Sequence, residues 1–326
     1  PLSLSRTPVG SQFGVYEMGM NHAGEIAALT AQVRPHVALI TAIAPAHIEN
    51  LGSIEAIADA KAEIFRGLEP GGTAIIPADS PHFARLRAAA LLVRARVVSF
   101  GRADHADVRL LDAVPAPGGG SLVTIDMGDR RLCFTIAAPG EHWVTNALAI
   151  MAAVRAAGGD LGAAGLALAE LEGMKGRGAR QQIPARGGEA LLIDESYNAN
   201  PASMAATLAQ LGTTPARRRI AILGAMKELG AHGAQFHRDL AAPLAAAAVD
   251  FAVLVGDEML ELADELGKSA GGALGKAIPF AHCRSGAEAM EALLEFGVES
   301  GDAILVKGSN SVGLGRVVEA LTRQQG

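Results

Sequence analysis

Residues 190–211, ALLIDESYNANPASMAATLAQL, contain the unit from which the fold is predicted. The apolar run Ala190–Ile193 has the composition of a buried strand, and Ser203–Leu211 is rich in helix-forming residues. Polar residues, beginning with Asp194 and Glu195, occupy the turn between them. A strand, a polar turn and a helix in this order are typical of α/β proteins with parallel sheets.

The same alternation recurs along the chain. The other predicted strands are Phe13–Glu17, Val37–Ile43, Thr73–Pro77, Arg219–Leu223, Phe251–Val255 and Ala303–Val306. The other predicted helices are Glu25–Gln32, Ser53–Leu68, Asn146–Ala157 and Ser285–Glu295. Residues 107–136 differ, because Pro and Gly turns interrupt alternating apolar and polar residues, and they predict a small antiparallel excursion.

A cluster of glycines between residues 173 and 188 precedes a new series of strands and helices. We therefore predict two domains, 1–182 and 183–326. The first is expected to hold a mostly parallel sheet with the antiparallel excursion, and the second a Rossmann-like sheet.

Composition excludes several classes of function. Half of the 326 residues are hydrophobic, the net charge is −6, and no basic run indicates a nucleic-acid partner. No apolar stretch reaches the length of a membrane span. The two cysteines, Cys133 and Cys283, are far apart in the sequence and favour a reducing cytoplasm. With no internal repeat, we expect a monomer.

Polar side chains follow several predicted strands at their carboxyl ends. They are Glu17, His47, Asp194, Glu195 and the run Lys307–Ser309. Each of these residues taken alone is as well explained as a solvated loop residue, and His47 as a structural or surface histidine. Together they predict a ligand site, because ligands of parallel sheets bind beyond the carboxyl ends of the strands.

Lys61 falls on the apolar stripe of the predicted helix Ser53–Leu68, between Ile57 and Ile64. A buried ammonium is costly, so the side chain either extends to solvent or is chemically changed. Addition of carbon dioxide to its neutral amine would give a carbamate, an anionic oxygen ligand for Mg²⁺ beside Glu17 and His47.

The phosphate-binding pattern G-x-x-x-x-G-K-[ST] has no match in these residues. The runs Gly267-Lys268-Ser269 and Gly275-Lys276 fail it, the first because Leu262 stands where the first glycine belongs. We expect any phosphate cradle to lie upstream of Pro1.

Several motifs together resemble the Mur ligase family over nearly the whole chain. They are E-M-G-M-N-H-A-G-E-I at 17–26, A-H-I-E at 46–49, A-K-A-E-I at 60–64, G-E-H at 140–142, T-N-A-L at 145–148, G-R at 176–177, D-E-S-Y-N-A-N-P at 194–201, L-G-A-M-K-E-L-G at 223–230 and K-G-S at 307–309. The S-Y-N-A-N-P motif resembles the branch of the family that adds a dipeptide.

The resemblance implies an ATP-dependent ligase of three domains, of which a P-loop-type central domain and a C-terminal domain are represented here. It implies UDP-N-acetylmuramoyl-tripeptide and D-alanyl-D-alanine as substrates, joined through an acyl phosphate during peptidoglycan precursor synthesis in the cytoplasm. The opening residues resemble the segment after the family's P-loop, so we expect the N-terminal domain and the P-loop to be missing and the chain alone to be inactive.

The resemblance also implies roles for particular residues. Glu17, His47 and Lys61 as a carbamate would bind Mg²⁺, while His142 and Asn146 would bind the nucleotide. Arg177 would stabilise the transferring phosphate, and Glu195 would face the nucleotide from the C-terminal domain once that domain closes. Substrates would contact Asn21, His22, Asn198, Asn200, Lys307 and Ser309.

The chain departs from the family pattern at four positions. Glu195 replaces an Asp, Ala225 an Asp, Trp143 an Asn and Pro77 an Asn. The changes at Trp143 and Pro77 bear on adenine recognition, and none removes a metal ligand. Two other functions remain open: another Mur or folylpolyglutamate-type amide ligase, or a catalytically silent binding module.

Overall fold

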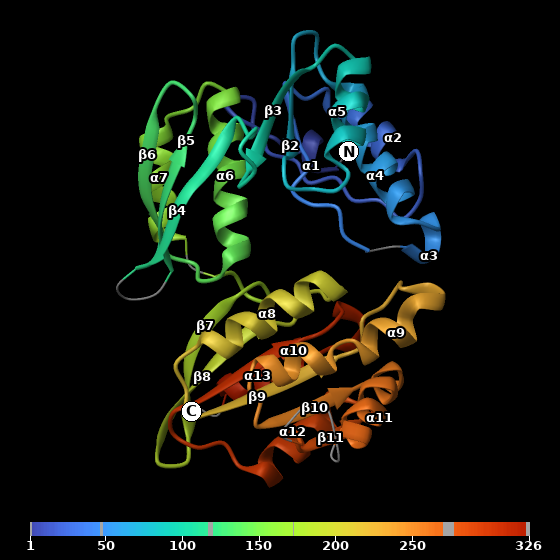
Figure 1. Cartoon of the computed structure of the whole chain (residues 1–326), viewed down its shortest axis with the longest axis vertical. Helices are drawn as coiled ribbons and strands as arrows, with labels where there is room; N and C mark the ends of the chain where they lie inside the picture. The colour runs from blue at the N-terminus through green and yellow to red at the C-terminus, as the bar shows by residue number, and fades with distance from the viewer. Residues whose placement is uncertain (1, 46–47, 117–119, 172, 270–276, 324–326) are drawn as a thin grey trace. The chain divides into compact units, whose positions relative to one another are not determined.

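The structure is a computed structural model that describes residues 2–323 except 46–47, 117–119, 172 and 270–276. The chain forms two compact units, Pro1–Leu171 and Glu172–Gly326 (Figure 1). The predicted boundary at residue 182 falls inside strand β7 (Ala179–Ala185). This strand pairs antiparallel with β8 (Gly188–Glu195) along its whole length, so hydrogen bonding places residues 179–182 in the second unit.

The sheet of the first unit has six strands in sequential order. They are β1 (Val37–Leu39), β2 (Thr73–Pro77), β3 (Arg96–Gly101), β4 (Val108–Pro115), β5 (Ser121–Asp126) and β6 (Arg131–Ile136). Strands β1 to β4 are parallel, whereas β4, β5 and β6 are antiparallel. The predicted parallel sheet with an antiparallel excursion is therefore confirmed.

Helices cover both faces of this sheet. In one cluster α6 (Glu141–Ala156) and α7 (Leu161–Glu170) pack on β3 to β6, and in the other α4 (Ile54–Ala62) and α5 (Phe83–Leu92) pack on β1 and β2. The remaining helical segments are α1 (Leu2–Ser5), α2 (Glu25–Val33), α3 (Ile48–Leu51) and the 3-10 helix η1 (Glu63–Gly67).

The sheet of the second unit has the order β11-β10-β9-β12-β8-β7. The strands not yet introduced are β9 (Arg218–Gly224), β10 (Phe251–Val255), β11 (Phe280–Cys283) and β12 (Asp302–Lys307). All neighbours pair in parallel except β7 with β8. This mixed α/β architecture confirms the predicted fold class.

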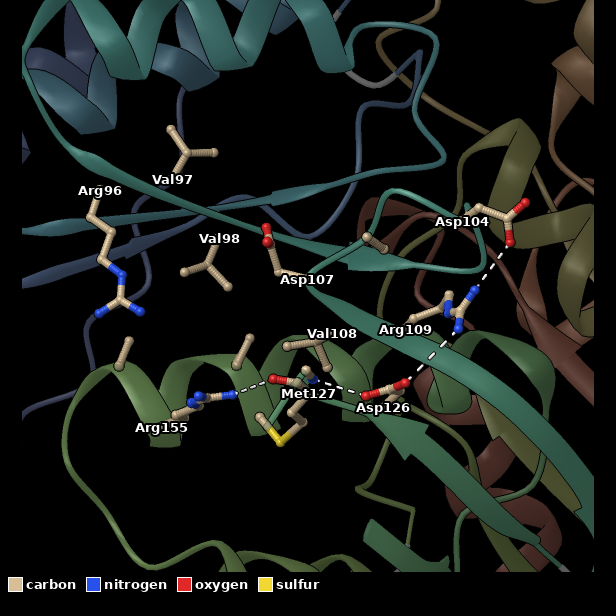
Figure 2. A pocket seen from close by; sticks show the side chains of 14 residues that line it. Arg96, Val97, Val98, Asp104, Asp107, Val108, Arg109, Asp126, Met127 and Arg155 are labelled. Atoms are coloured by element: carbon tan, nitrogen blue, oxygen red, sulfur yellow. Dashed lines mark hydrogen bonds and ion pairs between the residues drawn. The ribbon is translucent and has the colours of Figure 1, made fainter. Parts of the chain in front are cut away.

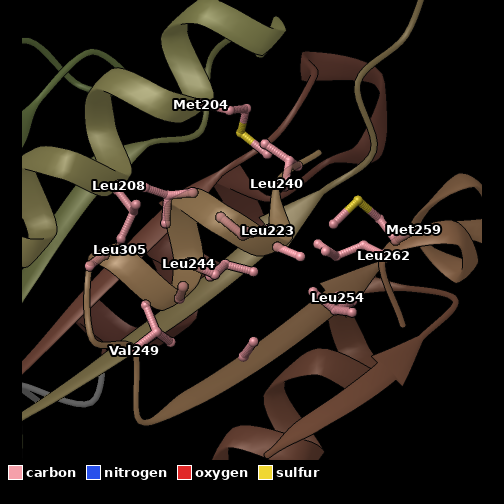
Figure 3. Close-up of a cluster of buried hydrophobic side chains, with 14 of the residues drawn as sticks. Met204, Leu208, Leu223, Leu240, Leu244, Val249, Leu254, Met259, Leu262 and Leu305 are labelled. Atoms are coloured by element: carbon pink, nitrogen blue, oxygen red, sulfur yellow. The ribbon is translucent and has the colours of Figure 1, made fainter. Parts of the chain in front are cut away.

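The central strands of the second sheet are buried on both faces, as parallel strands under helices must be. Leu223, Leu254 and Leu305 belong to one apolar cluster, whereas their chain neighbours Ile222, Val253 and Val306 belong to the other. Figure 3 shows the first cluster, to which helices on the same face of the sheet contribute.

Helices of the second unit divide between these clusters. The first cluster includes α8 (Pro201–Thr213), α10 (Ala241–Ala246), α11 (Leu260–Ser269) and the 3-10 helix η3 (Asp257–Met259). The second includes α12 (Gly286–Phe296) and α13 (Gly315–Arg323). The shorter segments are η2 (Gly230–His232), α9 (Gly233–Arg238) and η4 (Asn310–Val312).

Several elements differ from the prediction. Strand β1 ends at Leu39 rather than at Ile43, and α6 begins at Glu141 rather than at Asn146. Residues 13–17 form no strand, and Phe13 and Val15 are 59% and 97% exposed, because this alternating segment has neither a partner strand nor a core to cover. The predicted helix Ser53–Leu68 changes from α to 3-10 geometry at Glu63. There η1 packs closely on α2, where the Thr30 hydroxyl donates to the Ile64 carbonyl at 2.9 Å.

Among helices of the described residues, none combines the length and apolar character needed to cross a bilayer.

Candidate functional site

Three loops of the second unit meet at the carboxyl edge of its sheet. Strand β12 lies between β9 and β8, and Lys307 at its end is in register with Glu195 on β8 and Leu223 on β9. The turns after these three strands therefore bring together residues that are more than a hundred positions apart. This is the edge where α/β sheets bind ligands.

Glu195 and Lys307 form a buried ion pair at this edge. The Lys307 Nζ lies 3.7 Å from a Glu195 carboxylate oxygen, and the two side chains are 3% and 12% exposed, respectively. Burial raises the pKa of Glu195, and burial also lowers the pKa of Lys307. Each partner opposes the effect of burial on the pKa of the other, since a nearby opposite charge favours the charged form of each group.

The buried Asp194 carboxylate fixes the loops on either side of this pair. It accepts hydrogen bonds from the Gly176 amide at 2.7 Å, the Ser196 hydroxyl at 2.6 Å and the Ser196 amide at 3.1 Å. The Tyr197 amide in turn donates to the Gly176 carbonyl at 3.1 Å. Asp194 thus joins the 176–178 turn to the loop after β8.

Arg177, which is carried by this turn, stacks on Tyr197. Its guanidinium carbon lies 4.3 Å from the ring centroid, and Tyr197 is half exposed. A planar cation held on an aromatic face keeps its donors free for an anionic ligand.

The asparagines of the loop after β8 are partly used by the fold itself. The Asn200 side chain caps α8 by accepting from the Ser203 amide at 2.9 Å, and Pro201 occupies the first helical turn. The Asn198 carbonyl accepts from Lys307 Nζ at 2.9 Å, and its side-chain oxygen accepts from the Ala199 amide at 2.8 Å. Asn198 therefore lies directly beside the buried ion pair.

In the first unit, Lys61 is half-buried on α4, and burial lowers the pKa of its ammonium group. A lowered pKa increases the fraction of neutral amine, which is the form that carbon dioxide modifies. No hydrogen bond or ion pair involves the Lys61 side chain among the residues that the structure describes. The side chain thus has the chemistry that a carbamate needs.

Two residues after Lys61, the buried Glu63 carboxylate binds the start of α2. It accepts from the Gly24 amide at 2.8 and 3.0 Å and from the Ala27 amide at 3.2 Å. A carboxylate stabilises the free amides and positive dipole at a helix N-terminus. Glu63 thereby holds the loop that carries Asn21 and His22 against the segment that carries Lys61.

Of the other two predicted metal ligands, the structure describes only Glu17. Glu17 is exposed on its unpaired segment, and His47 lies outside the described residues. Where the structure describes the chain, no three His, Cys, Asp or Glu side chains come together as a metal site. The fit of Mg²⁺ therefore depends on the donor chemistry of Glu17 and Lys61. Both can supply an anionic oxygen, Lys61 only after carbamylation.

The predicted nucleotide residues lie on α6. His142 and Asn146 are four positions apart near the start of this helix, so they lie on one face, and both are partly buried. The His142 and Trp143 rings are tilted by 42° to one another, with their centroids 5.8 Å apart. A helix N-terminus favours anionic ligands, which suits a phosphate-bearing molecule.

A hollow of about 720 Å³ lies elsewhere on the first unit, between β3, β4 and the end of α6 (Figure 2). Its charged groups largely bind one another. Arg155 donates to the Met127 carbonyl at 2.7 Å, and Arg109 lies 3.2 Å from Asp104 and 3.9 Å from Asp126. None of the predicted site residues that the structure describes lines this hollow.

Comparison with known proteins gives the family. Residues 1–154 match the Mur ligase middle domain, and residues 179–310 match the Mur ligase glutamate ligase domain. The chain belongs to the Mur ligase family. The boundary between the two compact units, after Leu171, lies in the stretch between the two Mur ligase matches.

Relatives with curated names cover the same Mur ligase domains. A UDP-N-acetylmuramoyl-tripeptide–D-alanyl-D-alanine ligase of Synechocystis is 32% identical over 98% of this chain and 65% of its own length. A ligase of the same name from Escherichia coli is 33% identical over 79% of this chain and 56% of its own length. The chain thus spans less than two thirds of these Mur ligases.

A crystal structure of MurF from Acinetobacter baumannii shares the fold, with a TM-score of 0.80 at 29% identity. The match covers 94% of this chain and 63% of that one.

The structure brings together some of the residues predicted for a Mur ligase. Glu195, Asn198 and Lys307 are in contact or within 4 Å, and Ser309 follows the same strand. Asn21 and His22 share a loop, where both backbone amides donate to Glu25.

Sequence analysis assigned no role to Glu63 or His237 and placed Asp194 only among the polar residues of a predicted ligand site, although side-chain hydrogen bonds to backbone amides engage all three. A signal was available for two of them. Glu63 lies within the A-K-A-E-I motif and Asp194 within D-E-S-Y-N-A-N-P.

Proposed function

We propose that the protein is an ATP-dependent ligase that joins D-alanyl-D-alanine to UDP-N-acetylmuramoyl-tripeptide. The buried Glu195–Lys307 pair beside the S-Y-N-A-N-P loop carries the proposal. The names of the curated relatives support the choice of substrates.

The reaction needs activation of a carboxylate, which is a poor electrophile. Transfer of the ATP γ-phosphoryl group to the tripeptide carboxylate gives an acyl phosphate and ADP. The neutral amine of the dipeptide then attacks the acyl carbon, a tetrahedral intermediate forms, and phosphate leaves as the amide forms. Positioning and charge stabilisation account for most of such catalysis.

Residues of the second unit have the charges needed to bind the transferring phosphoryl group and the dipeptide. The Arg177 guanidinium, stacked on Tyr197, would stabilise the transferring phosphoryl group. Glu195 would face the nucleotide, and Lys307 with Asn198 would line the dipeptide site. Ser309 and Asn200 would complete this site.

Residues of the first unit would bind the nucleotide and the metal. Asn146 on α6 would contact the nucleotide base with His142 nearby, and Asn21 and His22 would approach the acceptor peptide. Glu17, His47 and carbamylated Lys61 would hold Mg²⁺, which neutralises phosphate charge when bound.

A substrate panel on the full-length protein tests the proposal. Product detection by mass spectrometry should show ATP-dependent amide formation with D-alanyl-D-alanine and none with single amino acids or folate. Ligation of a single amino acid or of glutamate to folate would instead identify another amide ligase, and no ligation would favour a binding module. Residues 1–326 alone should give no turnover, since they contain no P-loop motif.

The carbamate at Lys61 has its own test. Carbon-13 NMR after addition of labelled bicarbonate should give a carbamate resonance that disappears in Lys61→Ala. Short carboxylic acids should restore part of the lost activity of this variant. A spectrum without the resonance, together with no rescue, would favour an ordinary lysine that extends to solvent.

A further inference from the structure

His237 on α9 is a buried histidine to which the proposed reaction assigns no role. It is 1% exposed, yet both ring nitrogens are hydrogen-bonded. Nε2 accepts from the Met226 amide at 2.9 Å, and Nδ1 donates to the Gly233 carbonyl at 2.7 Å. These two bonds require the neutral tautomer with its proton on Nδ1. Burial lowers the pKa of His237, which also favours the neutral ring.

The amide that His237 binds lies at the centre of the loop after β9. The residue before it, Ala225, accepts a hydrogen bond from the Ser309 amide at 3.2 Å. The residue after it, Lys227, donates its amide to the Ser309 hydroxyl at 3.0 Å. Three consecutive residues are thus held, the outer two by Ser309 and the middle one by His237.

The loops after β9 and β12 are packed closely through their backbones, so the hydrogen bond from Met226 to His237 affects both loops. A Cβ at Gly224 would lie 3.2 Å from the Gly308 Cα, so the loops after β9 and β12 touch through backbone atoms. A shift of one loop would therefore displace the other. The Met226 amide is an internal donor that would be left without an acceptor if the imidazole were removed.

We propose that His237 is a positioning residue for the dipeptide site: its neutral imidazole holds the loop after β9, and through that loop it orients Ser309 beside Lys307. The inference rests on the proposed function, which places the dipeptide at Lys307 and Ser309. His237 itself acts only through the Met226 amide.

Two conservative substitutions separate positioning from general stability. The side-chain oxygen of His237→Gln reaches the position of Nε2 and can still accept from the Met226 amide. The shorter His237→Asn can still donate to the Gly233 carbonyl near the position of Nδ1 but loses the acceptor for Met226. Both variants are neutral and polar, so they form a matched pair.

Steady-state kinetics of the full-length protein provide the first readout. His237→Asn should raise KM for D-alanyl-D-alanine about tenfold, the effect of one lost buried hydrogen bond, and should leave KM for ATP within about twofold. His237→Gln should stay within about threefold of the wild type for all substrates. If both variants lost kcat to the same extent and kept the wild-type KM values, the role of His237 would be merely structural and the proposal would be overturned.

Hydrogen exchange provides a readout that does not need activity. His237→Asn should exchange faster than His237→Gln in peptides covering residues 224–229 and 307–311. Equal exchange would overturn the proposal. If the wild-type protein does not ligate the dipeptide, the proposed function fails separately, and this comparison still decides whether His237 holds the loops.

The wild-type protein offers a third measurement should His237→Asn not fold. Nitrogen-15 NMR of histidine-labelled protein, with the His237 signal assigned by its loss in His237→Gln, should show a neutral ring protonated on Nδ1. A ring protonated on Nε2, or an imidazolium at neutral pH, would contradict the hydrogen bond on which the inference depends.

Discussion

The Glu195–Lys307 pair should show strong energetic coupling because both side chains are buried. At 3.7 Å, and at an effective dielectric constant of about 20, the attraction between the charges is about 4 kcal/mol. Removal of one partner leaves the other charge in a poorly solvated site, which typically costs about 3 kcal/mol or more. Glu195→Gln and Lys307→Met should therefore each destabilise the second unit by about 3 kcal/mol.

The double variant should be destabilised by less than either single variant, by about 1 kcal/mol or less, since no unpaired charge remains. Because the protein has two compact units, bulk denaturation would mix their transitions. Native-state hydrogen exchange of the amides in β9 and β12 reports the opening free energy of this sheet directly.

An exposed ion pair in the same unit serves as the control. Lys175 and Glu319 lie 2.9 Å apart, which is closer than the buried pair, but their side chains are 75% and 43% exposed. The double-mutant cycle of Lys175→Met and Glu319→Gln should give a coupling of at most about 1 kcal/mol. Additive effects at Glu195 and Lys307, or a larger coupling at the exposed pair, would refute the role of burial.

Three further predictions concern packing, backbone and pH. In native-state hydrogen exchange, Leu208→Ala should lower the opening free energy of the second unit by about 2–5 kcal/mol because Leu208 is fully buried, whereas Leu294→Ala, at a residue of the same unit that is 60% exposed, should stay within about 0.5 kcal/mol. Gly176→Ala should cost about 3 kcal/mol, since its φ is +76° and a Cβ would lie 2.9 Å from the Tyr197 Cβ; Gly187→Ala, at φ +83° in open space, should cost only about 1 kcal/mol by the same assay. Because burial lowers the pKa of folded His237, the unfolded chain binds the proton first as pH falls below about 6.5. Stability should then fall toward the folded pKa by up to about 1.4 kcal/mol per pH unit, and exchange measurements should show a smaller slope for His237→Gln.

Much of the fold could be predicted because burial requires continuous apolar runs. Strands β2 and β10 have the predicted bounds, since each is a buried run of five residues that ends at a turn. Residues 13–17 have alternating apolar side chains instead, and they form no strand because they have no partner strand, so the prediction there was wrong. Alternation describes what a segment could bury, and pairing depends on contacts that lie far away in the sequence.

The candidate site was predictable only in part, for a similar reason. Lys61 could be identified because a charge interrupted an apolar stripe, and the structure places it half-buried. The roles of Glu63 and His237 depend on backbone amides of other segments, 39 and 11 residues away. A backbone amide has the same chemistry at every position, so the sequence carries no signal for such a partner.

The most direct test of the account is the location of the bound dipeptide. Hydrogen exchange of the full-length protein should be measured with UDP-N-acetylmuramoyl-tripeptide and a non-hydrolysable ATP analogue, with and without D-alanyl-D-alanine, and with L-alanyl-L-alanine as the control. The account predicts that only the D,D-dipeptide protects residues 195–200, 225–229 and 307–311. Protection confined to other segments, or equal protection by both dipeptides, would contradict it.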